Sequence, residues 1–267
     1  MKIAFVWWFD KANDVYDNWH DGLRAAIDVI GVDNDVDLYV GKYLPEGEYD
    51  FILFWDDSNS EFFQHLDKYN CRKGIILTTD PHNIENLRKL DVVFCESEPI
   101  YQAVRAQGLR AIKAFGTDTD FFSPTSVKKD IPFFYPATFS PWKRQSSIAH
   151  LTGLHCVGTV QPDGEEELQA CKDNGVKVEI GYFPAEKIRD YYRRAVDVPI
   201  PAIHGSERTC LEAMSMDILP KVNPNNVRTY SYVKEFVESR MRSPREFVLK
   251  NYSHRKYAED LMKGIRG

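Results

Sequence analysis

The stretch HGSERTCLEAMSM, residues 204–216, places polar and charged side chains at the start of an otherwise apolar helix. A helix start offers unpaired backbone N–H groups and a positive dipole end, which together favour a phosphate. Helical side chains lean toward the N-terminus, so the Glu212 carboxylate points back to the turn at Gly205. From there it can accept hydrogen bonds from ribose hydroxyls. The pattern predicts a nucleoside diphosphate site, with phosphates on the helix start and Glu212 on the sugar.

The same residues also fit a purely structural interpretation. Thr209-x-x-Glu212 matches a capping box, and Ser206 is an ordinary N-cap residue. This stretch alone leaves both interpretations open.

Composition limits the class of protein. The chain has 267 residues, 43% of them hydrophobic, and a net charge of -6, which is typical of one large or two small globular domains and argues against a broad nucleic-acid surface. No apolar run approaches the ~18–20 residues of a membrane span. Five scattered cysteines without a C-x-x-C pair predict reduced, mostly buried thiols. We expect a cytoplasmic protein, either free or peripheral at a membrane surface.

Short apolar runs alternate with amphipathic stretches along the first half of the chain. This rhythm predicts a parallel sheet with helices on both faces. The expected strands are 3–8, 36–40, 50–55, 74–79, 91–96 and 110–116, and the expected helices are 17–30, 59–69, 82–89 and 98–107. Ser97 is expected to cap the last of these helices and Gly108 to end it.

A polar break at 116–132 separates this half from a second one of the same kind. Its expected strands are 133–139, 154–158, 176–181 and 196–202, and its expected helices begin near 143, 164, 185, 206, 228 and 244, the last running to 265. The sequence therefore predicts an α/β chain of two Rossmann-like domains, 1–122 and 123–267, facing a cleft that holds a ligand.

Several familiar site motifs are missing. No G-x-G-x-x-G or P-loop follows a strand, and no cysteine or histidine cluster suggests zinc. The DTD at Asp118–Asp120 is best interpreted as a linker turn. We expect no metal and no cofactor.

Taken together, the motifs resemble GT-B glycosyltransferases, particularly the retaining family 4. The family hallmark is Glu, seven residues, Glu, then Ala-Met; here His204, seven residues and Glu212 precede Ala213 and Met214. GTDTDFFSP is similar to the family's interdomain linker, and YPATFSPWKRQ to its strand and turn with a phosphate-binding lysine, here Lys143. VKVEIGYFPAEK resembles the segment that receives the base, and the last helix resembles one that crosses back to the first domain.

The resemblance implies roles for particular residues. Lys143 and the backbone N–H groups near the helix start would hold the diphosphate, Glu212 the ribose, and His204 the transferred sugar. The usual second cation is replaced by Ala137 and Thr138, so Arg144 or Arg208 would supply that charge. The implied donor-binding residues are Lys143, Arg144, Gly181, Tyr182, Gly205, Ser206, Glu207, Arg208, Thr209 and Glu212.

The first domain is expected to hold the acceptor. Asp80 and His82 follow a strand in TTDPHN, and one of them would take the proton of the acceptor hydroxyl. Trp8 and Asp10 end the first strand and would contact an acceptor sugar, although the tryptophan equally suits core packing. A turn capped by Asn83 is the structural alternative for the TTDPHN loop.

The resemblance implies a metal-independent, retaining transferase that moves a sugar from a UDP- or GDP-linked donor to an acceptor hydroxyl. The acceptor can be a glycan, a lipid-linked sugar, a protein or a nucleobase. Two alternatives stay open: a non-catalytic nucleotide-sugar-binding module, and a nucleotide-sugar 2-epimerase on the same fold.

Overall fold

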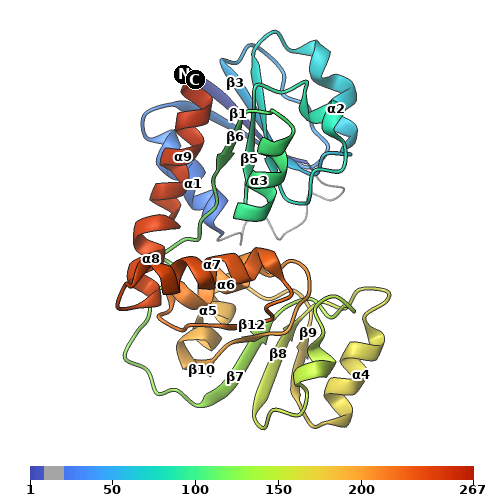
Figure 1. Cartoon of the computed structure of the whole chain (residues 1–267), viewed down its shortest axis with the longest axis vertical. Helices are drawn as coiled ribbons and strands as arrows, with labels where there is room; N and C mark the ends of the chain where they lie inside the picture. Colours follow the sequence, from blue (N-terminus) through green and yellow to red (C-terminus); the bar gives the residue numbers. More distant parts are fainter. Residues whose placement is uncertain (9–20) are drawn as a thin grey trace. The chain divides into compact units, whose positions relative to one another are not determined.

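The computed structural model describes residues 1–8 and 21–267, which form an α/β protein built on parallel sheets (Figure 1). The chain divides into two compact units: Met1–Phe115 with His254–Gly267, and Gly116–Ser253. The segment 116–122, placed in the first domain by the sequence analysis, lies in the second unit. Phe122 anchors it there, because its ring packs edge-on against Tyr192 and its carbonyl accepts the Ser215 hydroxyl at 2.6 Å.

The first unit contains a six-stranded parallel sheet in the order β2-β1-β3-β4-β5-β6. Its strands are β1 (Lys2–Trp7), β2 (Asp35–Val40), β3 (Phe51–Asp56), β4 (Arg72–Leu77), β5 (Val92–Cys95) and β6 (Ala111–Lys113). The central strands are continuous apolar runs, because a parallel sheet covered on both faces buries every residue of such a strand. The predicted strands of this half are confirmed to within a few residues.

Successive side chains of β1 pack into two different hydrophobic cores, one on each face of the sheet. Ile3 and Phe5 pack with α1 (Gly22–Gly31) and the C-terminal helix α9 (His254–Arg266). Ala4 and Val6 pack with the other helices of the unit: η1 (Glu61–Lys68), α2 (Ile84–Leu87) and α3 (Glu98–Ala106). The unit is therefore a three-layered α/β sandwich, as Figure 1 shows, and the last helix of the chain completes one of its layers.

The second unit contains a four-stranded parallel sheet in the order β10-β7-β8-β9 and a two-stranded sheet of β11 and β12. Its strands are β7 (Ile131–Pro136), β8 (Leu154–Gly158), β9 (Lys177–Ile180), β10 (Ala195–Asp197), β11 (Pro199–Ile200) and β12 (Lys221–Val222). Its helices are η2 (Gln145–Ile148), α4 (Glu165–Asp173), α5 (Ala185–Arg194), α6 (Glu207–Ser215), α7 (Val227–Ser239) and α8 (Pro244–Asn251).

Some predicted elements differ from the observed ones. The single helix expected over 244–265 is two helices, broken where Ser253 forms an isolated bridge with Thr117. The single strand expected over 196–202 is split between two sheets, and the two-residue β12 is too short for a sequence pattern. Ser97 stands at the start of α3, but its side chain makes no capping hydrogen bond.

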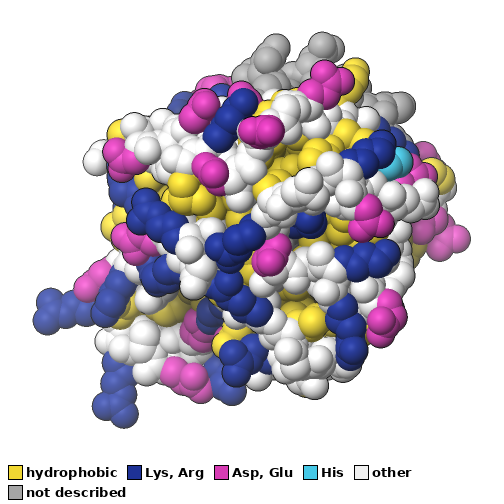
Figure 2. Space-filling model, turned by 90° about the horizontal axis from the view of Figure 1, so that it is seen from above, with side chains coloured by type: hydrophobic (Ala, Val, Ile, Leu, Met, Phe, Trp, Pro, Cys, Tyr) yellow, Lys and Arg dark blue, Asp and Glu magenta, His cyan; other side chains and the backbone are white. Residues whose placement is uncertain are grey.

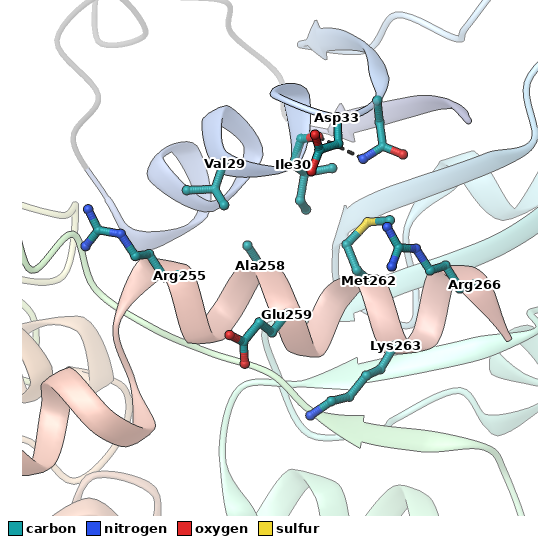
Figure 3. Close-up of a pocket in the computed structure, with 10 residues that line it drawn as sticks. Val29, Ile30, Asp33, Arg255, Ala258, Glu259, Met262, Lys263 and Arg266 are labelled. Atoms are coloured by element: carbon teal, nitrogen blue, oxygen red, sulfur yellow. Dashed lines mark hydrogen bonds between the residues drawn. The ribbon is translucent and has the colours of Figure 1, made fainter.

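A groove of about 610 Å³ lies along α1 and α9 in the first unit (Figure 3). It combines apolar Val29, Ala258 and Met262 with charged side chains of α9 and with Asp33, which follows α1. Among the described residues, none of those predicted for the site lines it.

The described helices all fall short of the length and apolar character that crossing a membrane requires. The prediction of mostly buried thiols is confirmed: all five cysteines are free, four are buried, and Cys71 is half-buried.

The packing of α9 gives a test of the first unit. A Cβ on Gly264 would lie 2.4 Å from Phe94 Cζ and 3.0 Å from Ile112 Cδ1, whereas one on Gly31 would meet nothing within 4 Å. We expect Gly264→Ala to lower the free energy of unfolding by about 1–3 kcal/mol through overpacking. Gly31→Ala, the matched control, should leave it unchanged or raise it by up to about 1 kcal/mol. Urea unfolding of both variants measures the difference, and equal stabilities would contradict this packing.

Candidate functional site

The turn before α6 has an uncommon backbone. Gly205 and Ser206 both adopt left-handed conformations, with φ of 71° and 74°. Glycine tolerates this region, but a serine there is strained and is held only by its surroundings. Such strain concentrates at functional sites.

Ser206 occupies the N-cap position of α6, yet its side chain makes no capping hydrogen bond. Its hydroxyl instead accepts from Lys143 Nζ at 2.8 Å and is hydrogen-bonded to the Tyr135 hydroxyl at 3.3 Å. The helix already begins at Glu207, so Thr209 cannot be the N-cap residue that a Thr209–Glu212 capping box requires. The capping-box interpretation is therefore wrong. Ser206 does stand at the N-cap position, as expected, but its side chain does not cap the first turn of α6.

Lys143 reaches this turn from the loop that follows β7. Its ammonium donates to Ser206 Oγ and, at 3.5 Å, to the carbonyl of His204. The pKa of Lys143 is lowered to about 8, chiefly by burial; the nearby Glu207 raises it, and Arg228 and Arg208 lower it. A half-buried cation at a helix start is suited to an anion.

Glu212 lies one turn further along α6 and is only 7% exposed. Its carboxylate accepts a hydrogen bond from the Tyr192 hydroxyl at 3.1 Å, and that hydroxyl also lies 3.4 Å from the carbonyl of Thr209. Burial and then the neighbouring Glu212 raise the pKa of Tyr192 well above its ordinary value, so the phenol stays a donor. Tyr192 thereby fixes the Glu212 carboxylate against α5.

Two residues that contact this turn or the helix start were not predicted from the sequence. Asn226, just before α7, donates through Nδ2 to the carbonyls of Ala202 at 3.2 Å and Gly205 at 2.9 Å. Arg228, in the first turn of α7, forms an ion pair with Glu207 in which both side chains are buried. The segment NPNNVRTY carries no recognisable motif, so only the folded chain brings these residues to the site.

The other predicted donor residues lie mostly at the protein surface. The His204 side chain, Arg144 and Arg208 are exposed, and Arg144 has a left-handed φ of 56°. Gly181 and Tyr182 follow the edge strand β9, where Gly181 has a φ of 138° and Tyr182 is 77% exposed. The structure thus brings Lys143, His204 through its carbonyl, and the turn at 205–209 together, with Glu212 one helical turn away.

In the first unit, Asp80 and His82 are exposed in the loop between β4 and α2. The Ser58 hydroxyl accepts from the backbone N–H groups of His82 and Asn83, each at 3.0 Å. The Asn83 side chain accepts from Asn86 N, which confirms the predicted cap.

Trp8 is 6% exposed and packs edge-on against Phe62, as the core-packing interpretation expects. Asp10 lies outside the described residues. A carboxylate that the sequence analysis passed over, Asp56, ends β3, and burial raises its pKa. In the described parts of the chain, no three His, Cys, Asp or Glu side chains are grouped so as to hold a metal ion.

The DTD segment forms the turn that its sequence predicts. The Asp118 carboxylate accepts from the backbone N–H groups of Asp120 at 3.2 Å and Phe121 at 3.0 Å.

Comparison with known proteins shows that the chain has a known fold. Neither models of protein families nor curated proteins gave a match. Among solved structures, HepE of Anabaena, in complex with UDP and glucose, is 13% identical, with a TM-score of 0.64 over 100% of this chain and 99% of that chain. A DNA-modifying β-glucosyltransferase studied with uridine diphosphoglucose is 14% identical (TM-score 0.58, 99% of each chain). A UDP-GlcNAc 2-epimerase from Neisseria meningitidis is 10% identical (TM-score 0.56, 100% of each chain). These likenesses confirm the α/β fold of the GT-B, Rossmann-like type.

The Tyr192–Glu212 contact can be tested by stability. We expect Tyr192→Phe to lower the free energy of unfolding by about 1.5–3 kcal/mol, because it removes a buried hydrogen bond to a charged group. Tyr182→Phe makes the same chemical change at an exposed position and should leave stability within about 0.5 kcal/mol. Chemical denaturation of the two variants measures this, and equal losses would show that Tyr192 does not hold Glu212.

Proposed function

We propose that the chain is a glycosyltransferase that uses a nucleotide-diphosphate sugar as donor and works without a metal. The observation that carries the proposal is the Lys143 ammonium held 2.8 Å from Ser206 at the left-handed start of α6, with Glu212 one turn behind it. The GT-B fold supports it, because this is where the resemblance puts the donor diphosphate. UDP is the first nucleotide to test, since UDP or a UDP-linked sugar is named with each of the three similar structures.

The proposed chemistry follows from charge. As the bond between the anomeric carbon and the donor phosphate breaks, negative charge grows on the phosphate oxygens. Lys143 and the N–H groups at Gly205–Glu207 would stabilise that charge from fixed positions. Glu212 would hold the ribose hydroxyls, and the exposed imidazole of His204 would contact the transferred sugar. The turn at Gly181 and Tyr182 would receive the base.

The acceptor oxygen forms the new bond to the anomeric carbon, and its proton passes to Asp80 or His82. Both are exposed in a loop that follows a strand of the first unit. Transfer with retention is part of the proposal and rests on the family resemblance. The charge of the protein limits the class of acceptor. Figure 2 shows basic side chains interspersed with acidic ones over one face, and the net charge of the chain is -6. This distribution favours a glycan, lipid-linked or protein acceptor over a long nucleic acid.

A 2-epimerase is the second candidate, because one such enzyme shares the fold over the whole chain. Incubation with UDP-GlcNAc and other UDP-sugars separates the possibilities. An epimerase releases an epimerised sugar without acceptor, a transferase releases UDP in step with a glycosylated acceptor, and a binding module releases neither.

The donor site is tested by isothermal titration calorimetry with UDP. We expect Lys143→Met and Glu212→Gln each to weaken UDP binding about 10- to 100-fold, since each removes charge-assisted hydrogen bonds. Lys172→Met, which changes an exposed lysine of α4, is the matched control and should bind like the wild type. Unchanged affinity in both site variants would refute the proposed site.

The affinity for UDP should also depend on pH. The pKa of Lys143 is about 8 and lies below that of a free lysine, so Lys143 in the unliganded site loses its positive charge as pH rises through 8. We expect the Kd for UDP to increase about tenfold between pH 7 and pH 9. The same titration of Lys143→Met should be flat over this range. An equally steep rise in that variant would assign the dependence to another group.

A further inference from the structure

The ion pair between Arg228 and Glu207 lies directly beside the proposed donor site. Its side chains are only 6% and 7% exposed, and a buried charge is stable only when it is paired. Arg228 comes from the first turn of α7 and Glu207 is the first residue of α6. The pair therefore joins the starts of two helices at the turn that carries Ser206.

Glu207 also faces Lys143 across Gly205. A Cβ at Gly205 would stand 2.8 Å from Lys143 Nζ and 3.9 Å from Glu207 Oε2. The other carboxylate oxygen, Oε1, contacts Arg228 Nε. One carboxylate thus lies between two cations, paired with Arg228 and close to Lys143.

The backbone around this carboxylate is held from the same side as Arg228. Asn226 Nδ2 donates to the carbonyls of Ala202 and Gly205, while its Oδ1 accepts from Thr229 N at 3.3 Å. The start of α7 therefore binds both the turn, through Asn226, and the Glu207 side chain, through Arg228.

Removal of Arg228 would leave the Glu207 carboxylate beside Lys143 without its buried partner. At low local dielectric, opposite charges this close attract strongly. Glu207 would then pair with the Lys143 ammonium and repel an incoming phosphate. The geometry makes Arg228 the group that prevents this competition.

We propose that Arg228 is a positioning residue that holds the Glu207 carboxylate away from Lys143, so that the Lys143 ammonium stays available to the donor diphosphate. This inference rests on the proposed function in that Lys143 is taken to bind phosphate.

The charges that face Lys143 support this assignment. They are Glu207 and Arg208 from α6 and Arg228 from α7. After burial, Glu207 raises the pKa of Lys143, and then Arg228 and Arg208 lower it. Loss of Arg228 must therefore raise the pKa of Lys143, and loss of Glu207 must lower it. A merely structural role of Arg228 would leave this titration in place.

Two measurements on the full chain test the inference. Calorimetry gives the Kd for UDP at pH 7.5. Acylation by acetic anhydride without nucleotide, followed by peptide mass spectrometry, gives the pH at which Lys143 becomes reactive, with exposed Lys172 as the internal reference. The variants are Arg228→Met, Arg228→Lys, Glu207→Gln, and Arg228→Met combined with Glu207→Gln.

We expect Arg228→Met to weaken UDP binding about tenfold or more and to move the Lys143 midpoint upward. The double variant should recover both, with a Kd within about threefold of the wild type, because the competing carboxylate is gone. Arg228→Lys keeps the charge and should stay within about threefold. Glu207→Gln should lower the Lys143 midpoint, and this shift tests the inference even if Arg228→Met fails to fold.

A double variant that binds UDP no better than Arg228→Met would overturn the inference, as would a Lys143 midpoint that no variant moves. If the wild-type chain binds no UDP, the proposed function fails, and acylation alone decides. Opposite shifts of the Lys143 midpoint in Arg228→Met and Glu207→Gln then support the electrostatic effect of this ion pair on Lys143. Unmoved midpoints refute it.

Discussion

The hydrogen bond from Lys143 Nζ to Ser206 Oγ is the contact on which the candidate site depends. Ser206 stands in a left-handed conformation that costs about 1–2 kcal/mol for a residue with a Cβ. Lys143, Tyr135 and Asn226 bind this residue or its neighbour Gly205 and so keep the turn in place. The Ser206 hydroxyl accepts from Lys143 and does not cap α6. The same bond therefore positions a cation and leaves the helix start uncapped by that side chain.

Packing of α6 against the core stabilises the conformation of this turn. Cys210, Leu211 and Met214 of α6 are fully buried, so the helix cannot rotate without opening the core. The Thr209 hydroxyl donates to the carbonyl of Pro136 at the end of β7 at 3.3 Å. The loop that carries the lysine begins at that strand end. In an open parallel sheet, ligands bind beyond the carboxyl ends of the strands, and this is where the two segments meet.

Much of this arrangement could be predicted from the sequence, and the rest depends on tertiary contacts. Short apolar runs predict most strands, because a strand that is buried on both faces is apolar at consecutive positions. The spacing of Glu212 from the helix start, with Lys143 after a strand, led to the candidate site. Tyr192, Asn226 and Arg228 escaped prediction, since each acts across 20 residues or more of chain and no local pattern marks it. The break between α8 and α9 was missed for the same reason: a bridge to Thr117 fixes it.

The central claim is that the start of α6 binds the donor diphosphate. X-ray diffraction from crystals of the full chain grown with UDP tests it most directly. We expect phosphate density within hydrogen-bonding distance of Lys143 Nζ and the N–H groups at 205–207, with the ribose against the Glu212 carboxylate. UDP bound elsewhere, for example in the groove along α1 and α9, with the Lys143–Ser206 bond undisturbed, would contradict the account.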